Sequence, residues 1–161
     1  MQKELLQDEP EVYCCNNQVI NSLLLHYAGR CKKSDIDFSC KIAIPDQLNI
    51  PDYDICILVG NLLENAVDAS QKLDSNRKII LEIKEHNDQL MLKITNNFKK
   101  EIEVIKNINR GLGLRSVQLV TQRYGGELFI EKYSPSLDNQ VSDDGINVFS
   151  ACVMIVNKKP G

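Results

Sequence analysis

The sequence predicts an α+β domain, a two-layer α/β sandwich in which helices cover one face of a mixed, mostly antiparallel sheet. The chain has 161 residues, which is enough for one domain with a sizeable core. Apolar residues recur at helical spacing in some segments and alternate as in strands in others. Most neighbouring strands are joined by connections too short for a crossover helix, which favours antiparallel pairing.

The first half of the chain is expected to form a helix, a strand and a second helix. Residues 16–32 show the three- and four-residue spacing of apolar side chains that indicates an amphipathic helix. Residues 36–44 alternate between apolar and polar side chains, as a half-buried strand does, and Pro45 ends this pattern. Residues 52–73 are apolar on most faces, which predicts a central and deeply buried helix.

The second half is expected to contain a hairpin, a third helix and two further strands. Strands at 78–85 and 89–95 flank His86, Asn87 and Asp88, whose residue types suit a hairpin turn. The expected order after this hairpin is a loop at 96–110, a helix at 111–124 that a glycine pair ends, and strands at 127–133 and 147–156.

Composition excludes several classes of function. The chain carries 19 Lys and Arg residues against 22 Asp and Glu residues, a net charge of -3, so no nucleic-acid partner is expected. Its six cysteines form no CxxC pair and have no histidine at ligand spacing, which argues against a zinc or redox site. No apolar run reaches the roughly 18 residues of a membrane span, and the acidic N-terminus lacks a signal-peptide core. We therefore expect a soluble chain in the cytoplasm.

Two asparagines lie four residues apart in the most apolar predicted helix. The segment GNLLENAVDAS places Asn61 and Asn65 on one helix face. A buried amide without a hydrogen-bond partner costs about 1 to 3 kcal/mol, so two of them need a reason. One reason is metal binding, because an amide oxygen suits Mg²⁺, which takes few protein ligands and keeps water and phosphate oxygens around it. The alternative is that both amides bond neighbouring backbone or water.

A second motif is the glycine pair at the start of the helix predicted for 111–124. In the segment RGLGLRSV, Gly111 and Gly113 allow backbone N–H groups to approach an anion, and the helix N-terminus favours negative charge. The pattern is not a P-loop, since the chain has no GxxxxGK[ST], and not a dinucleotide fingerprint, since no strand directly precedes it. On its own, a GxG pattern is weak evidence for phosphate binding.

The third motif follows the strand predicted for 89–95. Asn96 and Asn97 come directly after that strand and precede a loop with four Lys or Arg residues. An ordinary turn also explains two such asparagines, since Asn favours turns. The order of the motifs along the chain favours a functional interpretation: an asparagine pair on a helix, an asparagine at a strand end, a basic loop and a glycine pair.

These three segments resemble the N, G1 and G2 boxes of the GHKL nucleotide-binding superfamily, which includes histidine kinases, the gyrase B subunit and MutL. The resemblance covers about 36–156 and includes the segment QRYGGEL at 122–128. It is closest to the catalytic ATP-binding domain of sensor histidine kinases of the Agr and VirS quorum-sensing type, in which the G1 box has lost its glycines and the G2 box is a short GLGL. The resemblance implies the Bergerat fold of this superfamily.

The resemblance also implies that ATP and Mg²⁺ are the cofactors, and it assigns a role to each motif residue. Asn65 would ligate the Mg²⁺ that bridges the phosphates, and Asn61 would support that site. Asn96 stands where the family usually has an Asp that accepts a hydrogen bond from the adenine amino group, and an amide oxygen can accept the same bond. The phosphates would be bound by the backbone of Gly111, Leu112, Gly113 and Leu114. Residues 98–110 would form a lid over them, with the cations Lys99, Lys100, Lys106 and Arg110. A solvated charged loop explains these cations as well.

Two departures from the family pattern bear on the chemistry. Phe98 replaces the first glycine of the G1 box, so the pocket is built differently there. Asn61 replaces the Glu that orients the attacking water in the ATP-hydrolysing members, and an amide cannot act as a base. Phosphoryl transfer depends mainly on positioning and charge neutralisation, so a kinase is favoured over a hydrolase.

The resemblance further predicts that the chain is one part of a longer sensor protein. Residues 1–33 are interpreted as a tail and the C-terminal part of a dimerisation and phosphoacceptor helix, and 34–161 as the ATP-binding domain. Neither His26 nor His86 lies in an acceptor motif, so the phosphorylated histidine is expected on a helix outside this chain. The expected partners are ATP or ADP, that acceptor helix, a response regulator and, in the full-length protein, a second copy. The expected location is cytoplasmic, in a protein anchored to the membrane.

Two other functions fit the same motifs. Serine kinases that act as anti-sigma factors share the superfamily fold and would form acid-stable phosphoserine, whereas phosphohistidine is acid-labile. A non-catalytic adaptor, in which the altered G1 box no longer binds ATP, would show no nucleotide binding by calorimetry.

Overall fold

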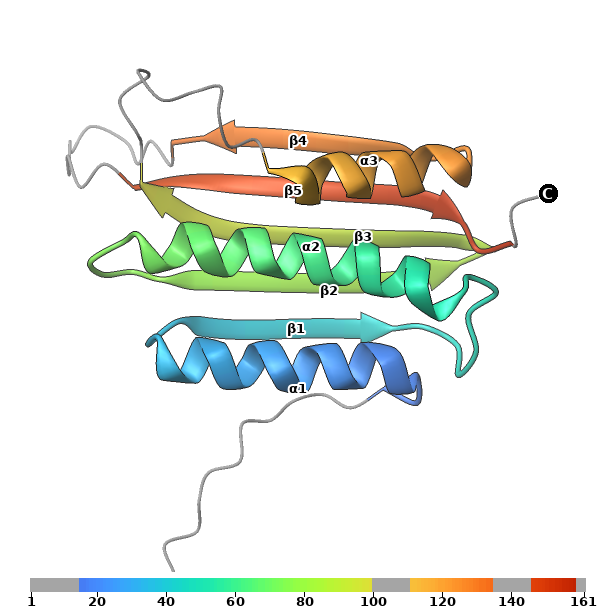
Figure 1. The fold of residues 1–161 in the computed structure, drawn as a ribbon, viewed down its shortest axis with the longest axis horizontal. Coiled ribbons are helices and arrows are strands. Elements are labelled where there is room, and N and C mark those ends of the chain that lie inside the picture. Colours follow the sequence, from blue (N-terminus) through green and yellow to red (C-terminus); the bar gives the residue numbers. More distant parts are fainter. Residues whose placement is uncertain (1–14, 100–110, 135–145, 159–161) are drawn as a thin grey trace, which may run out of the picture.

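A computed structural model describes residues 15–99, 111–134 and 146–158 of the chain (Figure 1). The elements follow one another in the predicted order. They are α1 (Gln18–Lys33), β1 (Asp37–Ala43), α2 (Asp52–Gln71), β2 (Lys78–His86), β3 (Gln89–Lys99), α3 (Leu112–Arg123), β4 (Glu127–Tyr133) and β5 (Ile146–Val156).

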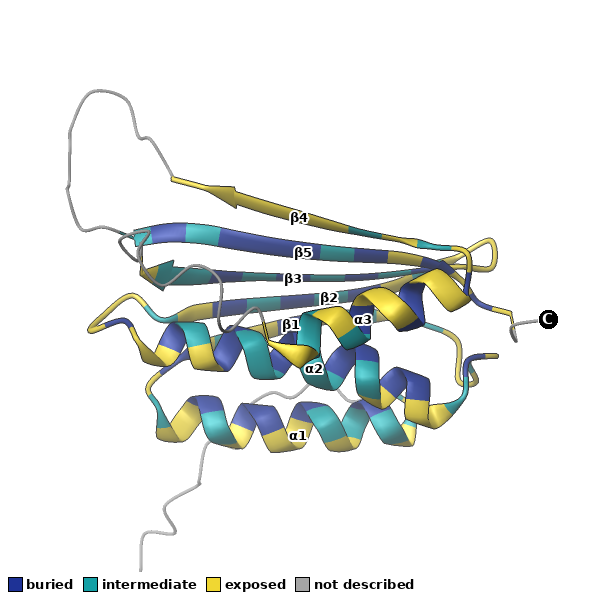
Figure 2. Ribbon diagram, turned by 45° about the horizontal axis from the view of Figure 1, so that its top comes forward, coloured by how far each residue is buried: buried dark blue, intermediate teal, exposed yellow. Residues whose placement is uncertain are grey.

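The five strands form one mixed sheet in the order β1-β2-β3-β5-β4. Strands β1 and β2 are parallel, because α2 crosses over between them, and the other neighbours are antiparallel. Figure 2 shows the helices on one face of this sheet, with their buried sides turned towards it. The predicted two-layer α+β architecture is therefore confirmed.

Helix α1 begins at a polar cap and packs into the common core. The Asn17 side chain accepts a hydrogen bond from the backbone N–H of Ile20 at 3.0 Å, which satisfies one of the unpaired donors of the first turn. Ile20, Leu24 and Tyr27 are buried in the same hydrophobic cluster as the sheet and α2. Whether residues 1–33 also belong to a dimerisation helix stays a prediction.

Helix α2 is the buried centre of the helical layer, as predicted, and it lies between α1 and α3 (Figure 1). A fully buried carboxylate in its first turn, that of Asp54, joins it to the end of α3. Arg123 donates to Asp54 at 3.0 Å, and the Tyr124 hydroxyl donates to it at 2.5 Å. This cluster was not expected from the sequence.

The β2–β3 hairpin turns at Asn87 and Asp88, whose φ angles are 51° and 62°. Both residue types tolerate this left-handed conformation, which a two-residue hairpin turn requires. The predicted hairpin is confirmed, with His86 as the last residue of β2 rather than part of the turn.

Strand β3 is longer than predicted, and this corrects the interpretation of 96–99. The strand was expected to end at residue 95, but it continues to Lys99 because β5 pairs with it along its whole length, from Gln89 opposite Val156 to Lys99 opposite Ile146. Asn96 is therefore an internal strand residue, and Phe98 and Lys99 belong to the sheet rather than to a loop.

Within the described ranges, no helix combines the length and the apolar composition that crossing a membrane requires.

Candidate functional site

Helices α2 and α3 run antiparallel, and this brings two predicted site residues together. Asp54 at the start of α2 contacts Arg123 at the end of α3. Near the other end of α3, a Cβ atom built on Gly113 would lie only 3.1 Å from Asn61 Oδ1. The asparagine helix and the glycine pair are therefore neighbours, as the resemblance implied.

Asn61 is partly engaged by its own helix. Its amide nitrogen donates to the Ile57 carbonyl oxygen at 2.8 Å, which fixes the side chain with Oδ1 against Gly113. The alternative weighed from the sequence, an amide that bonds neighbouring backbone, thus holds for the Asn61 nitrogen. Its oxygen keeps the capacity to accept a further hydrogen bond.

Asn65 differs from Asn61 in that its side chain has no hydrogen bond to any residue in the described ranges. It is half-buried and lies one helical turn after Asn61 on the same face. Four residues advance a helix by about 6 Å, so Asn65 lies about 6 Å further along α2 than Asn61, which contacts Gly113. Helix α3 runs in the opposite direction and begins at Leu112, so this advance takes Asn65 beyond the first residue of α3. Its amide is therefore available at the N-terminal end of α3.

The N-terminus of α3 has no side-chain cap. The cap residue is Gly111, which offers no side-chain hydrogen bond, and the first turn contains no acidic residue. Leu112 is 82% exposed, whereas Leu114 packs against the core and holds the helix on α2. The first N–H groups of α3 thus keep the partial positive charge that favours an anion.

Asn96 is 1% exposed and carries an unpaired oxygen. Its side chain lies on the helix-facing side of β3, in phase with the buried Leu92 and Ile94. The amide nitrogen donates to the Asn97 carbonyl oxygen at 3.0 Å, but Oδ1 has no hydrogen-bond partner among the described residues. An unpaired buried acceptor costs about 1 to 3 kcal/mol, which a donor on a ligand would recover.

A second buried oxygen without a partner in the described ranges is Ser70 Oγ, in the last turns of α2. Ser70 is fully buried, so it faces the sheet beneath α2 rather than solvent. Ser70 was not among the residues expected at the site, although its position four residues after the buried Ala66 places it on the inner face of α2.

Phe98 lies two residues after Asn96 on the same face of β3 and packs against the core. The Lys132 ammonium lies 5.8 Å from the centroid of its ring, within range of a cation–π interaction. Across the sheet, Asn147 of β5 pairs with Phe98 and accepts a hydrogen bond from the Ser134 hydroxyl. The sequence could have placed Lys132 on this face of the sheet, because it lies four residues after Leu128 in β4 and side chains alternate between the two faces of a strand.

Three of the predicted lid cations, Lys100, Lys106 and Arg110, lie outside the described residues. Their assignment stays a prediction.

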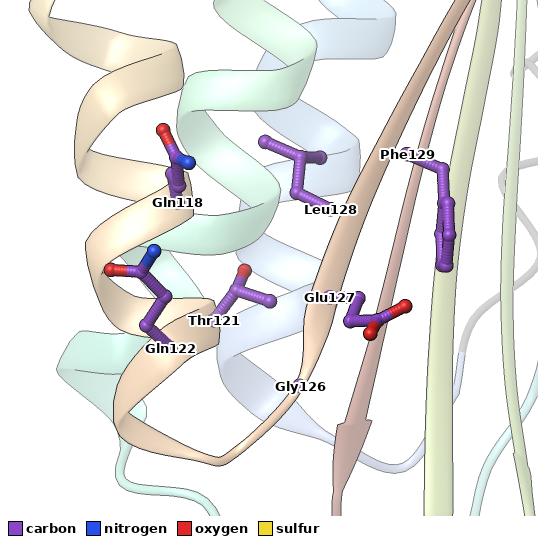
Figure 3. A pocket seen from close by; sticks show the side chains of 7 residues that line it. All are labelled: Gln118, Thr121, Gln122, Gly126, Glu127, Leu128 and Phe129. Atoms are coloured by element: carbon purple, nitrogen blue, oxygen red, sulfur yellow. The ribbon is translucent and has the colours of Figure 1, made fainter.

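A separate hollow of about 250 Å³ lies between α3 and β4 (Figure 3). Its lining comes from the C-terminal half of α3 and the start of β4, the opposite end of α3 from Gly113, and it therefore does not include the asparagines of the candidate site. The residues that line it are Gln118, Thr121, Gln122, Gly126, Glu127, Leu128 and Phe129.

The sequence matches a known family model and one curated protein. A model of the GHKL domain matches residues 50–142. A probable C4-dicarboxylate sensor kinase of Halalkalibacterium halodurans is 28% identical in an alignment of 92 residues that covers 49% of this chain and 17% of that protein. The match thus spans a small part of the relative's length.

Solved structures share the fold. The catalytic domain of histidine kinase ThkA superposes with a TM-score of 0.62 at 20% identity, over 87% of this chain and 90% of that domain. Histidine kinase ThkA in complex with the response regulator TrrA gives a TM-score of 0.60 at 18% identity, over 88% of this chain and 41% of that one. At these identities the likeness shows the fold.

Proposed function

Because this chain belongs to the GHKL domain family, we propose that it is the ATP-binding catalytic domain of a two-component sensor histidine kinase. Its fold is that of a histidine kinase catalytic domain. The observation that carries the proposal is the buried oxygen of Asn96, which lacks a donor among the described residues. An adenine amino group is a donor of the required kind.

Asn96 binds the base through the orientation of its amide. With the nitrogen donating to the Asn97 carbonyl, Oδ1 is the atom left to face a ligand. It therefore accepts a hydrogen bond from the exocyclic amino group of adenine, and it disfavours guanine, which presents a carbonyl oxygen at that position. The other buried oxygen without a partner in the described ranges, Ser70 Oγ, belongs to α2 and has no assigned part in this recognition.

The phosphates are bound where α2 extends past the start of α3. The uncapped N–H groups of Gly111, Leu112 and Gly113 provide donors for phosphate oxygens. Asn65 is the residue that would hold Mg²⁺, since its half-buried amide has no hydrogen bond within the described ranges. Bound Mg²⁺ would supply neutralisation of the charge that the phosphates carry.

The residues at this site fit a transferase better than a hydrolase. Asn61 is a neutral amide that bonds the Ile57 carbonyl, so it cannot take a proton from water. The neighbouring Glu64 is ion-paired with Arg30, as described below, and its carboxylate faces away from α3. The chain therefore positions a nucleotide for a nucleophile that another element brings, which in a histidine kinase is a histidine.

The partners follow from this role. We propose that the γ-phosphoryl group passes to a histidine on a helix outside this chain and from there to a response regulator. The full-length protein would form a dimer. It would be anchored to the membrane, with this domain in the cytoplasm. The proposed assignment to the Agr and VirS subgroup rests on three features of the sequence: the segment NLLENAVDAS, the altered G1 box and the short GLGL motif.

Nucleotide titration by calorimetry tests the proposal. We expect ATP and ADP to bind, with higher affinity when Mg²⁺ is present than with EDTA, and GTP to bind at least tenfold more weakly than ATP. Absence of ATP binding under both conditions would leave the non-catalytic adaptor as the function.

A further inference from the structure

Two helices that border each other, α1 and α2, are joined by a cluster of three side chains outside the nucleotide site. The Glu64 carboxylate of α2 accepts a hydrogen bond from the Tyr27 hydroxyl at 2.9 Å and another from the Arg30 guanidinium at 2.5 Å. The Tyr27 hydroxyl also lies 3.2 Å from the Gly60 carbonyl oxygen, one turn earlier on α2. We call Tyr27, Arg30 and Glu64 the α1–α2 bracket.

The bracket is charged at neutral pH, and both of its hydrogen bonds to Glu64 reach the same oxygen, Oε2. The Arg30 hydrogen bond is the main cause that lowers the pKa of Glu64, so the carboxylate is ionised. Burial, reinforced by the hydrogen bond to Glu64, raises the pKa of Tyr27 to about 12, so the phenol keeps its proton. The Arg30 guanidinium also lies 5.4 Å from the centroid of the Tyr27 ring, which keeps the two α1 residues together.

Glu64 and Asn65 are neighbours in the sequence but face different helices. Successive residues on a helix are about 100° apart, so a carboxylate that reaches α1 leaves the next side chain turned about a quarter turn away from α1. Asn61, on the face of Asn65, contacts Gly113 of α3, and α2 lies between α1 and α3 (Figure 1). Holding Glu64 therefore sets the direction of Asn65.

We propose that the α1–α2 bracket is a positioning device for the metal-binding asparagine: it fixes the rotation of α2 about its axis, so that Asn65 points beyond the N-terminus of α3. This inference rests on the proposed role of Asn65. A helix has a radius of about 5 to 6 Å including side chains, so a rotation of about 10° moves a side-chain tip by roughly 1 Å. A displacement of that size is enough to weaken a geometrically demanding site.

A purely stabilising ion pair would behave differently. The side chains of Arg30 and Glu64 are 30% and 44% exposed, and ion pairs exposed to this degree contribute little to stability. If the bracket only stabilised the fold, its loss would leave Mg²⁺-dependent binding intact. If it positions Asn65, its loss lowers that binding while the fold stays close to that of the parent.

The test is ATP titration with Mg²⁺ and with EDTA for the parent chain and its variants. The measured quantity is the factor by which Mg²⁺ raises the affinity for ATP over that in EDTA. We expect this factor to be threefold to tenfold smaller in Arg30→Met and Glu64→Gln than in the parent, with the affinity in EDTA unchanged. Arg30→Lys should restore most of the loss, since it keeps the charge next to Glu64. Tyr27→Phe keeps the buried ring and removes only the hydroxyl, so it provides a second measure should the charge variants fold poorly.

A matched control and a measurement without nucleotide complete the test. Lys84→Met breaks an ion pair with Glu82 on the sheet and should leave the Mg²⁺-dependent gain unchanged. In the nucleotide-free protein, amide hydrogen exchange over residues 60–67 should be faster in Arg30→Met than in the parent.

Two outcomes would overturn the inference. If Asn65→Ala loses the Mg²⁺-dependent gain but the bracket variants keep it, the bracket does not position Asn65 and the proposed function stands. If Asn65→Ala also keeps the gain, the metal assignment and the bracket inference fail together.

Discussion

Asn61 Oδ1 lies 3.1 Å from the position that a Cβ atom on Gly113 would occupy. This contact joins the central helix to the glycine pair, which lies about fifty residues later in the sequence. It leaves no spare room for a larger side chain at residue 113, so this glycine has a packing role as well as an expected role at the phosphates. The contact also sets how far Asn65 projects past α3.

Replacing Asn65 with Ala should weaken Mg²⁺-dependent ATP binding by about tenfold or more, because one ligand oxygen at the end of α3 is lost. Calorimetry with Mg²⁺ and with EDTA measures the effect. Gln122→Ala, an exposed change in the C-terminal half of the same helix layer, serves as the control and should bind as the parent does. Equal affinities of the Asn65 variant and the parent would refute the metal assignment.

Replacing Asn96 with Leu should lower ATP affinity by about tenfold to a hundredfold, because the variant removes the only acceptor this residue offers to the base. Asn96→Asp keeps an acceptor and should bind ATP within about threefold of the parent. The control is Asn97→Ala, on the opposite face of β3, where the side chain donates to the Asn76 carbonyl. ATP binding by Asn96→Leu at parental strength would place adenine elsewhere.

Gly126→Ala should destabilise the domain by about 3 kcal/mol or more, because its new Cβ atom would lie 2.1 Å from the Met154 carbonyl oxygen and 2.6 Å from Ile155 Cγ2. Gly29→Ala is the matched control: a Cβ there has no neighbour within 4 Å, and the residue lies in α1. It should stabilise the domain by about 0.5 to 1 kcal/mol through helix propensity. Urea unfolding measures both, and equal effects of the two variants would contradict the packing described at Gly126.

Asp54→Ala should cost about 2 to 4 kcal/mol of unfolding free energy, because it leaves the buried Tyr124 hydroxyl without its carboxylate. Burial, and after it the hydrogen bond to Asp54, raises the pKa of Tyr124, so this phenol stays protonated and needs an acceptor. In contrast, Asp88→Asn removes the charge of an exposed ion pair with Lys158 and should change stability by less than about 1 kcal/mol. A cost for Asp54→Ala no larger than that of the control would show that the cluster is dispensable.

The stabilising effect of Glu64 should disappear in acid. Its native pKa lies below its ordinary value, so the unfolded chain binds more protons between the two values and stability rises with pH across this window. The stability difference between the parent and Glu64→Gln should be complete above the ordinary carboxyl pKa of about 4.3 and vanish as pH falls through the lowered native value. Urea midpoints measured from about pH 3 to pH 7 test this; a difference that does not vary with pH would show that the carboxylate charge plays no part.

Local pattern predicted the elements of this fold because burial on one face of a helix or strand imposes a period on the sequence. The helices at 18–33 and 52–71 and the hairpin at Asn87 follow from that period and from turn chemistry. The end of β3 does not, since Asn97 to Lys99 extend beyond the residues that pair with β2 and find their strand partner in β5, about fifty residues later. The local sequence pattern of a segment does not predict its pairing with a strand that far along the chain.

The sequence by itself determined which residues are proposed to carry the chemistry: an asparagine pair four apart on one helix face, an asparagine on a strand, and glycines at a helix start. Only the tertiary structure decided how these residues are used. It directed the Asn61 nitrogen to its own backbone, left the Asn96 oxygen buried without a partner in the described ranges, and joined Glu64 to α1. The physical reason is that helical and strand periods fix the face on which a side chain lies, whereas its hydrogen-bond partner is set by whichever distant element packs against that face.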